Sequence, residues 1–270
     1  MDRRLTPANG RVAALHLAGS VTADQYLAGW AMSVAVPVAD LRAAPHGGRD
    51  RQLLLGAQVT VFEDRTGWSF VQATDGHVGY LRSDQLGPVV APTHFVATPA
   101  THAYTEETFK SPDLLHLPLG CRVRVEDERH KFFETEVGFV PKKHLRGLDR
   151  PMGDPVTVAQ LHFGVPYLWG GNSTRGIDCS GLVSAGLQAC GIACPPDSDL
   201  QLAELGTAFS DDYRRGDLIF WKGHVGFMVD AETLIHANAH HMAVVYEPIA
   251  QAVVRIAAQG DGDVIAQKRL

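Results

Sequence analysis

A short pattern of residues occurs twice in the first half of the chain. The first copy contains Leu55-Gly56, Val59-x-Val61, Gly67-Trp68 and Val78-Gly79-Tyr80-Leu81. The second copy contains Leu119-Gly120, Val123-x-Val125, Lys131-Phe132 and Val137-Gly138-Phe139-Val140. Apolar residues at every second position predict strands, and Asp75-Gly76 predicts a turn between two of them. A repeat of short strands limits this half of the chain to small all-β domains.

The pattern changes after Arg150. Asp154-Pro155 is typical of a helix N-cap followed by proline, and Gly164 is a stop signal for that helix. A second helix is predicted over 179–190, with Gly191 as its stop, and a third from Asp197 or Ser198 to Gly206. Strand-like runs follow over 217–221, 224–229, 233–237 and 243–246. Helices followed by an antiparallel sheet predict an α+β domain.

The net charge of the 270-residue chain is −6. This charge gives no reason to expect nucleic acid or an anionic membrane as a partner. No stretch approaches 18 consecutive apolar residues, so no transmembrane helix is predicted. The charged start Met1-Asp2-Arg3-Arg4 is not followed by the apolar run of a signal peptide. We therefore expect a cytoplasmic protein with reduced cysteines, and a periplasmic or secreted one is the alternative.

Cys179 lies where the second predicted helix begins, in Ile177-Asp178-Cys179-Ser180-Gly181. A helix start presents unpaired backbone N–H groups and the positive end of the helix dipole. Both favour the thiolate, which is the nucleophilic form of cysteine. The same N–H groups are able to stabilise an oxyanion formed by attack on a carbonyl. The plain alternative is a buried structural cysteine.

A thiol nucleophile needs a base, and two histidines lie in adjacent predicted strands. His224 begins one strand, His236 lies in the next, and Asp230-Ala231-Glu232 predicts the turn between them. If Gly226 lies opposite His236, the two imidazoles are diagonal neighbours on one face of the sheet. A register slip of one residue would place them on opposite faces. His224 would then take the Cys179 proton, and His236 would fix the tautomer and orientation of His224.

Five motifs occur in order over about residues 150–250: Pro166-Tyr167-Leu168-Trp169-Gly170-Gly171, Asp178-Cys179-Ser180-Gly181, Arg215-Gly216-Asp217-Leu218, His224-Val225-Gly226 and Ile235-His236-Ala237. They resemble the NlpC-type family of cell-wall peptidases. The resemblance implies a papain-like fold with a Cys-His-His triad, in which Cys179, His224 and His236 are nucleophile, base and orienting residue. Tyr167 carries over as a hydroxyl beside the nucleophile, with a packed aromatic as the alternative. Trp169 is a further candidate for contact with substrate.

The repeated pattern, together with the opening run Leu41-Arg42-Ala43-Ala44-Pro45, resembles bacterial SH3-like domains. We expect an N-terminal segment at 1–32, SH3-like barrels at 33–88 and 90–148, and the peptidase domain at 150–270. A short helix beginning at Thr22-Ala23-Asp24 is expected to cover one barrel. The predicted fold is thus α+β, a papain-like domain preceded by two small all-β barrels.

Two such barrels before the peptidase domain resemble one branch of the family, the γ-D-glutamyl-L-diamino acid endopeptidases. Members of that branch recognise the free N-terminal L-Ala of L-Ala-γ-D-Glu peptides, and some act in murein recycling. The resemblance implies that Asp178 pairs with the substrate ammonium and that Ser180 and Ser198 hydrogen-bond the substrate, although Ser198 alternatively caps a helix. From the first barrel, His77 or Tyr80 is expected near the site, or else both are ordinary barrel residues.

The predicted activity is hydrolysis of the γ-D-glutamyl–diamino acid bond of murein peptides, with diaminopimelate or lysine after that bond. We expect no cofactor, because Cys190-x-x-x-Cys194 lacks a nearby second pair of ligands for zinc. The alternatives are a secreted hydrolase that acts on intact wall, a non-catalytic peptidoglycan-binding protein and a thiol acyltransferase. The sequence leaves the oligomeric state open.

Overall fold

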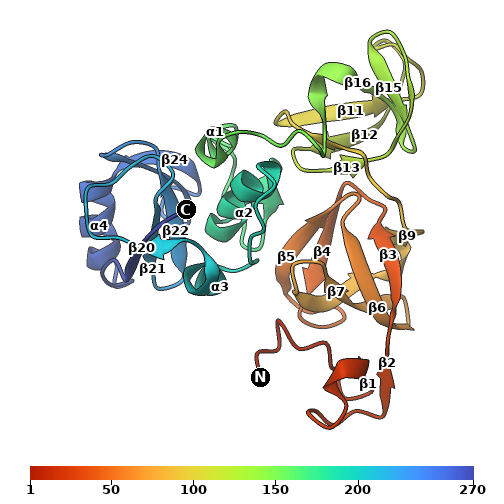
Figure 1. Cartoon of the computed structure of the whole chain (residues 1–270), viewed down its shortest axis with the longest axis horizontal. Coiled ribbons are helices and arrows are strands. Elements are labelled where there is room, and N and C mark those ends of the chain that lie inside the picture. Colours follow the sequence, from red (N-terminus) through yellow and green to blue (C-terminus); the bar gives the residue numbers. More distant parts are fainter. The chain divides into compact units, whose positions relative to one another are not determined.

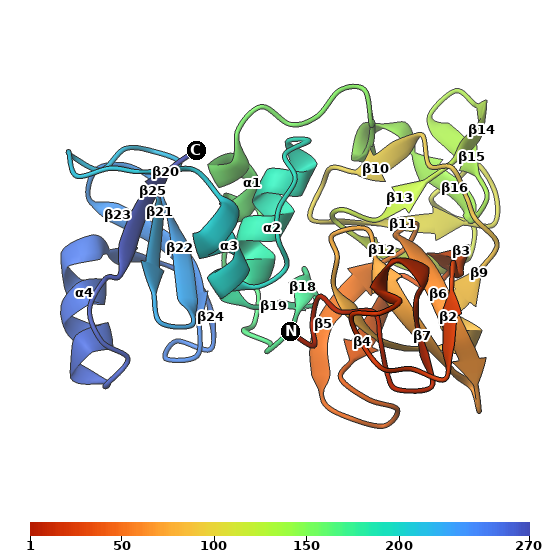
Figure 2. The ribbon, with the colours of Figure 1, turned by 60° about the horizontal axis from the view of Figure 1, so that its bottom comes forward.

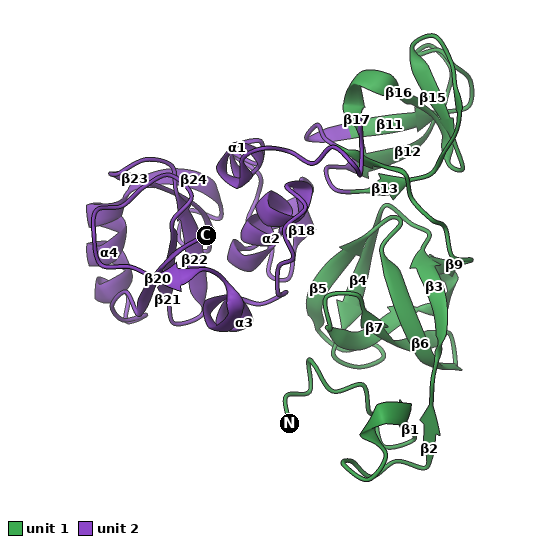
Figure 3. Cartoon of the chain, in the orientation of Figure 1, with its two compact units in different colours: residues 1–96, 101–117, 121–145 green, residues 97–100, 118–120, 146–270 purple.

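The computed structural model describes residues 1–270, and the chain divides into two compact units (Figure 3). The first unit comprises residues 1–96, 101–117 and 121–145, and the second comprises residues 97–100, 118–120 and 146–270. No helix in the structure is both long enough and apolar enough to cross a membrane.

The first unit begins with a small two-stranded sheet. Strands β1 (Val12–Ala14) and β2 (Gln25–Leu27) pair in parallel, and a 3₁₀ turn at Leu15–Leu17 lies between them. The prediction of a helix beginning at Thr22 is therefore wrong. So short a segment gains little from helix formation alone, and here its backbone pairs with β1 instead. The apolar side chains of β1 pack with Phe62 and Phe70.

A seven-stranded sheet follows, in the order β5-β4-β8-β7-β6-β3-β9 (Figure 1). Its strands are β3 (Trp30–Val34), β4 (Val38–Arg42), β5 (Arg49–Leu54), β6 (Gln58–Arg65), β7 (Trp68–Ala73), β8 (Val78–Arg82) and β9 (Leu86–Gly87). Val59 and Val61 are buried against Val71 and Leu81, whereas Gln58 and Thr60 are half-buried. The alternation seen in the sequence thus marks the inward face of β6.

The second copy of the pattern forms a five-stranded sheet, β12-β11-β16-β15-β14, and a three-stranded sheet, β13-β10-β17. The strands are β10 (His94–Val96), β11 (Ala100–Tyr104), β12 (Asp113–Pro118), β13 (Arg122–Val123), β14 (Val125–Glu128), β15 (Phe132–Thr135), β16 (Gly138–Pro141) and β17 (Leu145–Gly147). Their core contains Val96, Leu117, Val123 and Val140. The N-terminal half of the chain is therefore rich in β-structure, as predicted.

The two copies also share their irregularities. A β-bulge falls between Val61 and Glu63 in the first copy and between Val125 and Asp127 in the second. In each copy a 3₁₀ turn follows the closing strand, at Ser83–Gln85 and at Lys142–His144. Bulges bend a strand at a fixed place, so the repeat extends from the residue pattern to the path of the backbone.

Four helices belong to the second unit: α1 (Pro155–Gln160), α2 (Cys179–Ala189), α3 (Ser198–Glu204) and α4 (Ile249–Ala258). The N-cap of α1 is Asp154, whose carboxylate accepts from the backbone N–H of Val156 at 3.0 Å. This helix ends at Gln160, four residues before the predicted stop at Gly164, because the chain continues there in tight turns. The starts predicted for α1, α2 and α3 are confirmed, whereas α4 was not predicted.

A six-stranded sheet completes this unit, in the order β20-β25-β21-β22-β23-β24. Its strands are β20 (Thr207–Ala208), β21 (Leu218–Trp221), β22 (His224–Met228), β23 (Thr233–Asn238), β24 (Ala243–Pro248) and β25 (Ala266–Arg269). A separate hairpin joins β18 (Asn172–Ser173) and β19 (Gly176–Ile177). The four strand-like runs of the sequence are β21 to β24, whereas β18, β19, β20 and β25 were not predicted.

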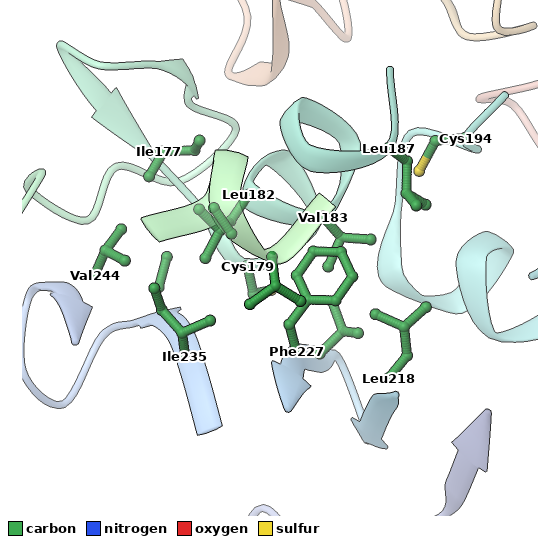
Figure 4. Packing of buried hydrophobic residues seen from close by; sticks show 14 of the residues in the cluster. Ile177, Cys179, Leu182, Val183, Leu187, Cys194, Leu218, Phe227, Ile235 and Val244 are labelled. Carbon is green, nitrogen blue, oxygen red and sulfur yellow. The ribbon is translucent and has the colours of Figure 1, made fainter. Parts of the chain in front are cut away.

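Helices cover both faces of the six-stranded sheet (Figure 2). On one face, Phe227, Ile235 and Val244 pack against Leu182 and Val183 of α2 (Figure 4). On the other face, the buried side chains of α4 pack against the sheet, and this cluster contains Ile219, Trp221, Met228, Leu234, Ile249, Ala252 and Ile256. Burial of the apolar cluster between α2 and the sheet fixes the start of α2 beside the strands that carry the histidines.

Candidate active site

Cys179 is the first residue of α2, and Asp178 is the N-cap. One carboxylate oxygen of Asp178 accepts from the backbone N–H of Gly181 at 2.7 Å, and the other accepts from that of Gly170 at 2.8 Å. A Cβ atom at Gly181 would lie 2.3 Å from the carbonyl oxygen of Gly171, so only glycine fits there. Asp178 therefore links the start of α2 to the loop that contains Gly170, and the close approach of the two backbones fixes that loop in place.

The surroundings of the Cys179 thiol favour its neutral form. Its side chain is buried, and Sγ donates a long hydrogen bond of 3.9 Å to the carbonyl oxygen of Gly223, the residue before His224. Burial, followed by the negative charge of Asp178, raises the pKa of the Cys179 thiol above its ordinary value, although nearby backbone N–H groups act in the opposite direction. The backbone N–H groups at the helix start lower the pKa of the thiol, as predicted, but burial raises it by more.

The predicted hairpin of β22 and β23 is confirmed. Phe227 pairs with Ile235 across the two strands, and Asp230 closes the turn by accepting from the backbone N–H groups of Glu232 and Thr233 at 2.9 and 2.8 Å. This register places the histidines on one face, where His224 Nε2 lies 2.9 Å from His236 Nδ1. The free ring nitrogen of His224 is consequently Nδ1.

Beyond His236 lies an ion pair that the sequence reasoning missed. His236 Nε2 is 2.9 Å from Glu247 Oε2, and Arg255 binds both oxygens of Glu247, with Nε at 2.8 Å and Nη2 at 2.7 Å. The side-chain amide of Asn238 also approaches His236 Nε2, at 3.0 Å. Strand β24 carries Glu247 and helix α4 carries Arg255, so the network crosses three elements. Its only signal in the sequence was that Glu247 directly follows the strand predicted over 243–246.

Burial sets the charges of this network. Burial lowers the pKa of both histidines, and His224 is lowered further by the nearby positive charge of a protonated His236. Burial alone would raise the pKa of Glu247, but hydrogen bonds from Arg255 and His236 outweigh it and hold that pKa well below its usual value. Two neutral imidazoles therefore rest against an ionised carboxylate at neutral pH.

Comparisons with known proteins agree with this geometry. Residues 164–258 match the model of the NlpC/P60 family, and residues 41–86 match the bacterial dipeptidyl-peptidase Sh3 domain. The chain thus contains an NlpC/P60 domain, which is a cysteine-peptidase domain. The match of the Sh3 domain includes the whole first copy of the repeated pattern.

Curated relatives share both parts. The chain is 27% identical over 215 residues to a γ-D-glutamyl-L-lysine dipeptidyl-peptidase of Bacillus subtilis, a match that covers 69% of this chain and 71% of that protein. It is 28% identical to the dipeptidyl-peptidase 6 of Lysinibacillus sphaericus, over 64% of this chain but only 45% of that protein. A crystal structure of an NlpC/P60 family protein from Bacillus cereus has the same fold, with a TM-score of 0.75, 20% identity and coverage of 89% and 99%.

Four of the predicted substrate residues lie around the start of α2 in the NlpC/P60 domain. Burial, followed by the charges of Cys179 and Asp178, raises the pKa of Tyr167, so its hydroxyl keeps its proton. Trp169 is 70% exposed, and Ser180 is buried and donates to Asp178 at 3.1 Å. Oδ1 of Asp178 thus accepts from both Gly181 and Ser180, and Oδ2 accepts from Gly170.

The other three predicted residues have different settings. Ser198 is the first residue of α3, and the N-cap position belongs to Asp197. His77 and Tyr80 belong to the first unit, where His77 is fully buried with Nε2 3.8 Å from Asp50, and Tyr80 packs on the ring of Phe70. These residues remain predictions for substrate contact.

The NlpC/P60 domain contains no group of three or more potential ligands placed to hold a metal ion. Cys190 and Cys194 are both free, and Cys194 is buried beside Ser184 and Gln201. Gln201 itself was missed by the sequence reasoning. It is fully buried and donates to the carbonyl oxygens of Ser180 and Pro195, both at 3.0 Å, so it links α3 to the start of α2.

Proposed function

We propose that Cys179, His224 and His236 are the nucleophile, the base and the orienting residue of an amide-hydrolysing site. The observation that carries this proposal is the hydrogen bond between His224 and His236, together with the hydrogen bond from the Cys179 thiol to Gly223, the residue before His224. A neutral thiol beside a neutral imidazole is a suitable starting state, because the proton moves from Sγ to His224 as the sulfur attacks.

The reaction follows in two steps. Cys179 Sγ attacks the substrate carbonyl carbon, its proton passes to His224 Nδ1, and the negative charge on the carbonyl oxygen is stabilised by backbone N–H groups at the start of α2. The amine then leaves with the proton from His224, and the acyl group remains on Cys179 as a thioester. Water then attacks the thioester and gives its proton to His224, and the carboxylic acid and the thiol are released.

For the substrate, we propose a murein peptide that begins L-Ala-γ-D-Glu and is cut before its diamino acid, diaminopimelate or lysine. Two Bacillus relatives named as γ-D-glutamyl-L-lysine dipeptidyl-peptidases support this class. The negative charge of Asp178 is suited to the free ammonium of L-Ala, and the exposed ring of Trp169 is suited to the peptide. Ser180, Ser198 and the protonated hydroxyl of Tyr167 are proposed to donate to its carbonyl or carboxylate oxygens.

We also propose the arrangement of the chain around this site: SH3-like barrels at 33–88 and 90–148 and a papain-like domain at 150–270. His77 and Tyr80 of the first barrel are proposed to close one side of the substrate site. Short peptides with a free amine are products of wall breakdown, so a cytoplasmic role in murein recycling fits this specificity.

The test is incubation of the reduced protein with L-Ala-γ-D-Glu-meso-diaminopimelate, with the lysine analogue and with an N-acetylated version of each. We expect release of the dipeptide L-Ala-D-Glu from the free peptides and at least tenfold slower cleavage after acetylation, because the acetyl group removes the charge that pairs with Asp178. Cleavage of none of the peptides would contradict the proposed substrate. Equal cleavage of free and acetylated peptides would contradict only the role of the amine.

A further inference from the structure

We propose that Glu247, held by Arg255, is a positioning residue that determines which ring nitrogen of each histidine carries the proton. This inference rests on the roles proposed above for Cys179 and His224. It adds a residue pair from β24 and α4 that lies outside the Cys-His-His set, and it explains why His224 presents a lone pair, not a proton, at Nδ1.

The proton positions follow from one end of the network. Arg255 donates to both oxygens of Glu247, so the carboxylate is ionised and acts only as an acceptor. His236 Nε2, at 2.9 Å from Glu247, must then carry a proton. The neutral ring of His236 therefore has a lone pair at Nδ1, which accepts from Nε2 of His224 at 2.9 Å. This leaves the lone pair of His224 at Nδ1, which is the state that a base requires.

Asn238 provides a competing arrangement. Its side-chain oxygen accepts from the backbone N–H of His241 at 2.8 Å and lies 3.0 Å from His241 Nδ1, which fixes the amide so that its NH₂ group faces His236 Nε2 at 3.0 Å. A donor in this position favours a lone pair at Nε2 and hence the opposite tautomer. The ionised carboxylate prevails, because hydrogen bonds to a charged acceptor are about twice as strong as neutral ones.

The network is shielded from water, so the protein groups around each histidine determine which tautomer it adopts. His236 is fully buried, and Glu247 and Asn238 are 7% and 6% exposed. The groups that face His236 are Glu247, Asn238 and His224, with Arg255 behind Glu247 and His241 behind Asn238. Only Glu247 among the direct neighbours is a permanent acceptor, so its loss leaves a donor as the dominant neighbour of Nε2.

Glu247→Gln tests the proposal directly. Arg255 needs an acceptor, so the new amide turns its oxygen toward the guanidinium and its NH₂ group toward His236, and both neighbours of Nε2 are then donors. We expect His236 to move its proton to Nδ1 and His224 to move its proton to Nδ1 as well. The base is then blocked, and kcat for peptide cleavage falls roughly 100-fold to 10,000-fold with little change in KM.

The double variant Glu247→Gln/Asn238→Asp is the rescue. An aspartate at 238 is able to keep the hydrogen bond from the His241 backbone with one oxygen and to present the other to His236 Nε2. We expect the original tautomers to return, together with most of the lost kcat. A purely structural role for Glu247 would predict no rescue, because the second substitution does not restore the Arg255 ion pair.

Asp217→Asn is the matched control. Asp217 is 1% exposed and binds Arg269 through two contacts of 2.8 Å, as Glu247 binds Arg255. Its carboxylate hydrogen-bonds Arg269 and the backbone N–H of Arg214, not a histidine. We expect Asp217→Asn to lower the melting temperature at least as much as Glu247→Gln does, while kcat and the histidine tautomers stay as in the unaltered protein.

The readout that needs no substrate is the long-range ¹H–¹⁵N spectrum of ¹⁵N-histidine-labelled protein, with His224 and His236 assigned from the spectra of His224→Gln and His236→Gln. It reports directly which ring nitrogen is protonated. Unchanged tautomers in Glu247→Gln would overturn the inference, even if kcat fell. If the unaltered protein cleaves none of the murein peptides, the proposed function fails while the tautomer measurement still decides the role of Glu247.

Discussion

The two regions that form the candidate site differ in how the chain builds them. The start of α2 is built from sequence neighbours, since Asp178 bonds Gly170 and Gly181, and Cys179 follows it directly. The histidine side is built from β22, β23, β24 and α4, and it needs the registers of three strands to be correct. Residues that are close in sequence therefore position Cys179, the proposed nucleophile. The position of His224, the proposed base, depends on contacts between distant parts of the chain.

The two regions also differ in how their surroundings shift the pKa values of their titratable groups. At the start of α2, burial and a carboxylate both act to raise the pKa of the thiol. On the sheet, burial lowers the pKa of the imidazoles while Arg255 keeps the only carboxylate ionised. In the proposed mechanism both regions are neutral at rest, and the proton passes from Cys179 to His224 when a substrate binds.

The largest effect is expected from Cys179→Ala. Because no other group at the site supplies the nucleophile, we expect murein-peptide hydrolysis to fall below detection, while peptide binding persists in a calorimetric titration. Cys190→Ala removes a half-buried thiol outside the site and should leave turnover unchanged. Residual turnover by Cys179→Ala at more than a thousandth of the original rate would contradict the nucleophile assignment.

A smaller but still large effect is expected from Gly181→Ala. The added Cβ would meet the Gly171 carbonyl at 2.3 Å, so the loop or the helix must move. We expect a loss of about 1–3 kcal/mol in the free energy of unfolding, measured by urea denaturation, with most of the activity lost. Gly153→Ala is a control, since nothing lies within 4 Å of a Cβ there. Equal stability of the two variants would show that the start of α2 is less rigid than the local contacts indicate.

Acid is expected to act on the histidine side first. The pKa values of His224 and His236 are lowered in the folded protein, so below their ordinary value of 6.5 the unfolded chain binds more protons than the folded one. Stability should therefore fall as pH drops from about 6.5, by up to about 1.4 kcal/mol per pH unit for each histidine. Below the ordinary pKa of Glu247, 4.5, its lowered pKa adds a further loss in the same direction.

Urea denaturation between pH 7 and pH 5 measures this slope. His236→Gln should flatten it by the contribution of one histidine, whereas His16→Gln, at an exposed site in the other unit, should leave it unchanged. A slope that is the same in all three proteins would show that the sheet histidines are not the groups that take up protons on unfolding.

The smallest effect is expected from Asp178→Asn. Asparagine is also a good N-cap, but it keeps only one of the two backbone hydrogen bonds, so we expect a loss of about 1 kcal/mol in the free energy of unfolding. The substitution also removes the negative charge that raises the pKa of Cys179. We expect the pH profile of thiol alkylation by iodoacetamide to move to lower pH. Asp154→Asn, which caps α1 in the same manner, should leave that profile in place. A profile unchanged by Asp178→Asn would mean that burial alone sets this pKa.

The same local and non-local division explains what the sequence could predict. Asp154-Pro155, the start of α2 and the turn at Asp230 are encoded by adjacent residues, and all were predicted correctly. The pairing of His224 with His236 was predicted because one turn fixed its register. The relation of Glu247 to His236 depends on the next pairing, of β23 with β24, and no turn signal pointed to it.

Other parts escaped prediction for the same physical reason. Helix α4 packs its apolar face on a sheet that is assembled from distant strands, and that sheet supplies most of its stabilisation. Residues 25–27 pair with β1, a partner that the local sequence did not identify, so a helix was expected there in error. In the repeat, the inward-facing valines were recognisable from alternation alone, whereas the bulges after Val61 and Val125 were not.

The hydrogen bond from Cys179 to the Gly223 carbonyl has a consequence for the durability of the protein. Peroxide attacks thiolates much faster than thiols, and the first product, a sulfenic acid, proceeds to irreversible forms. A buried thiol whose proton is held by a backbone carbonyl resists this damage for as long as no substrate is bound. We therefore expect Cys179, the proposed nucleophile, to be oxidised slowly while no substrate is bound.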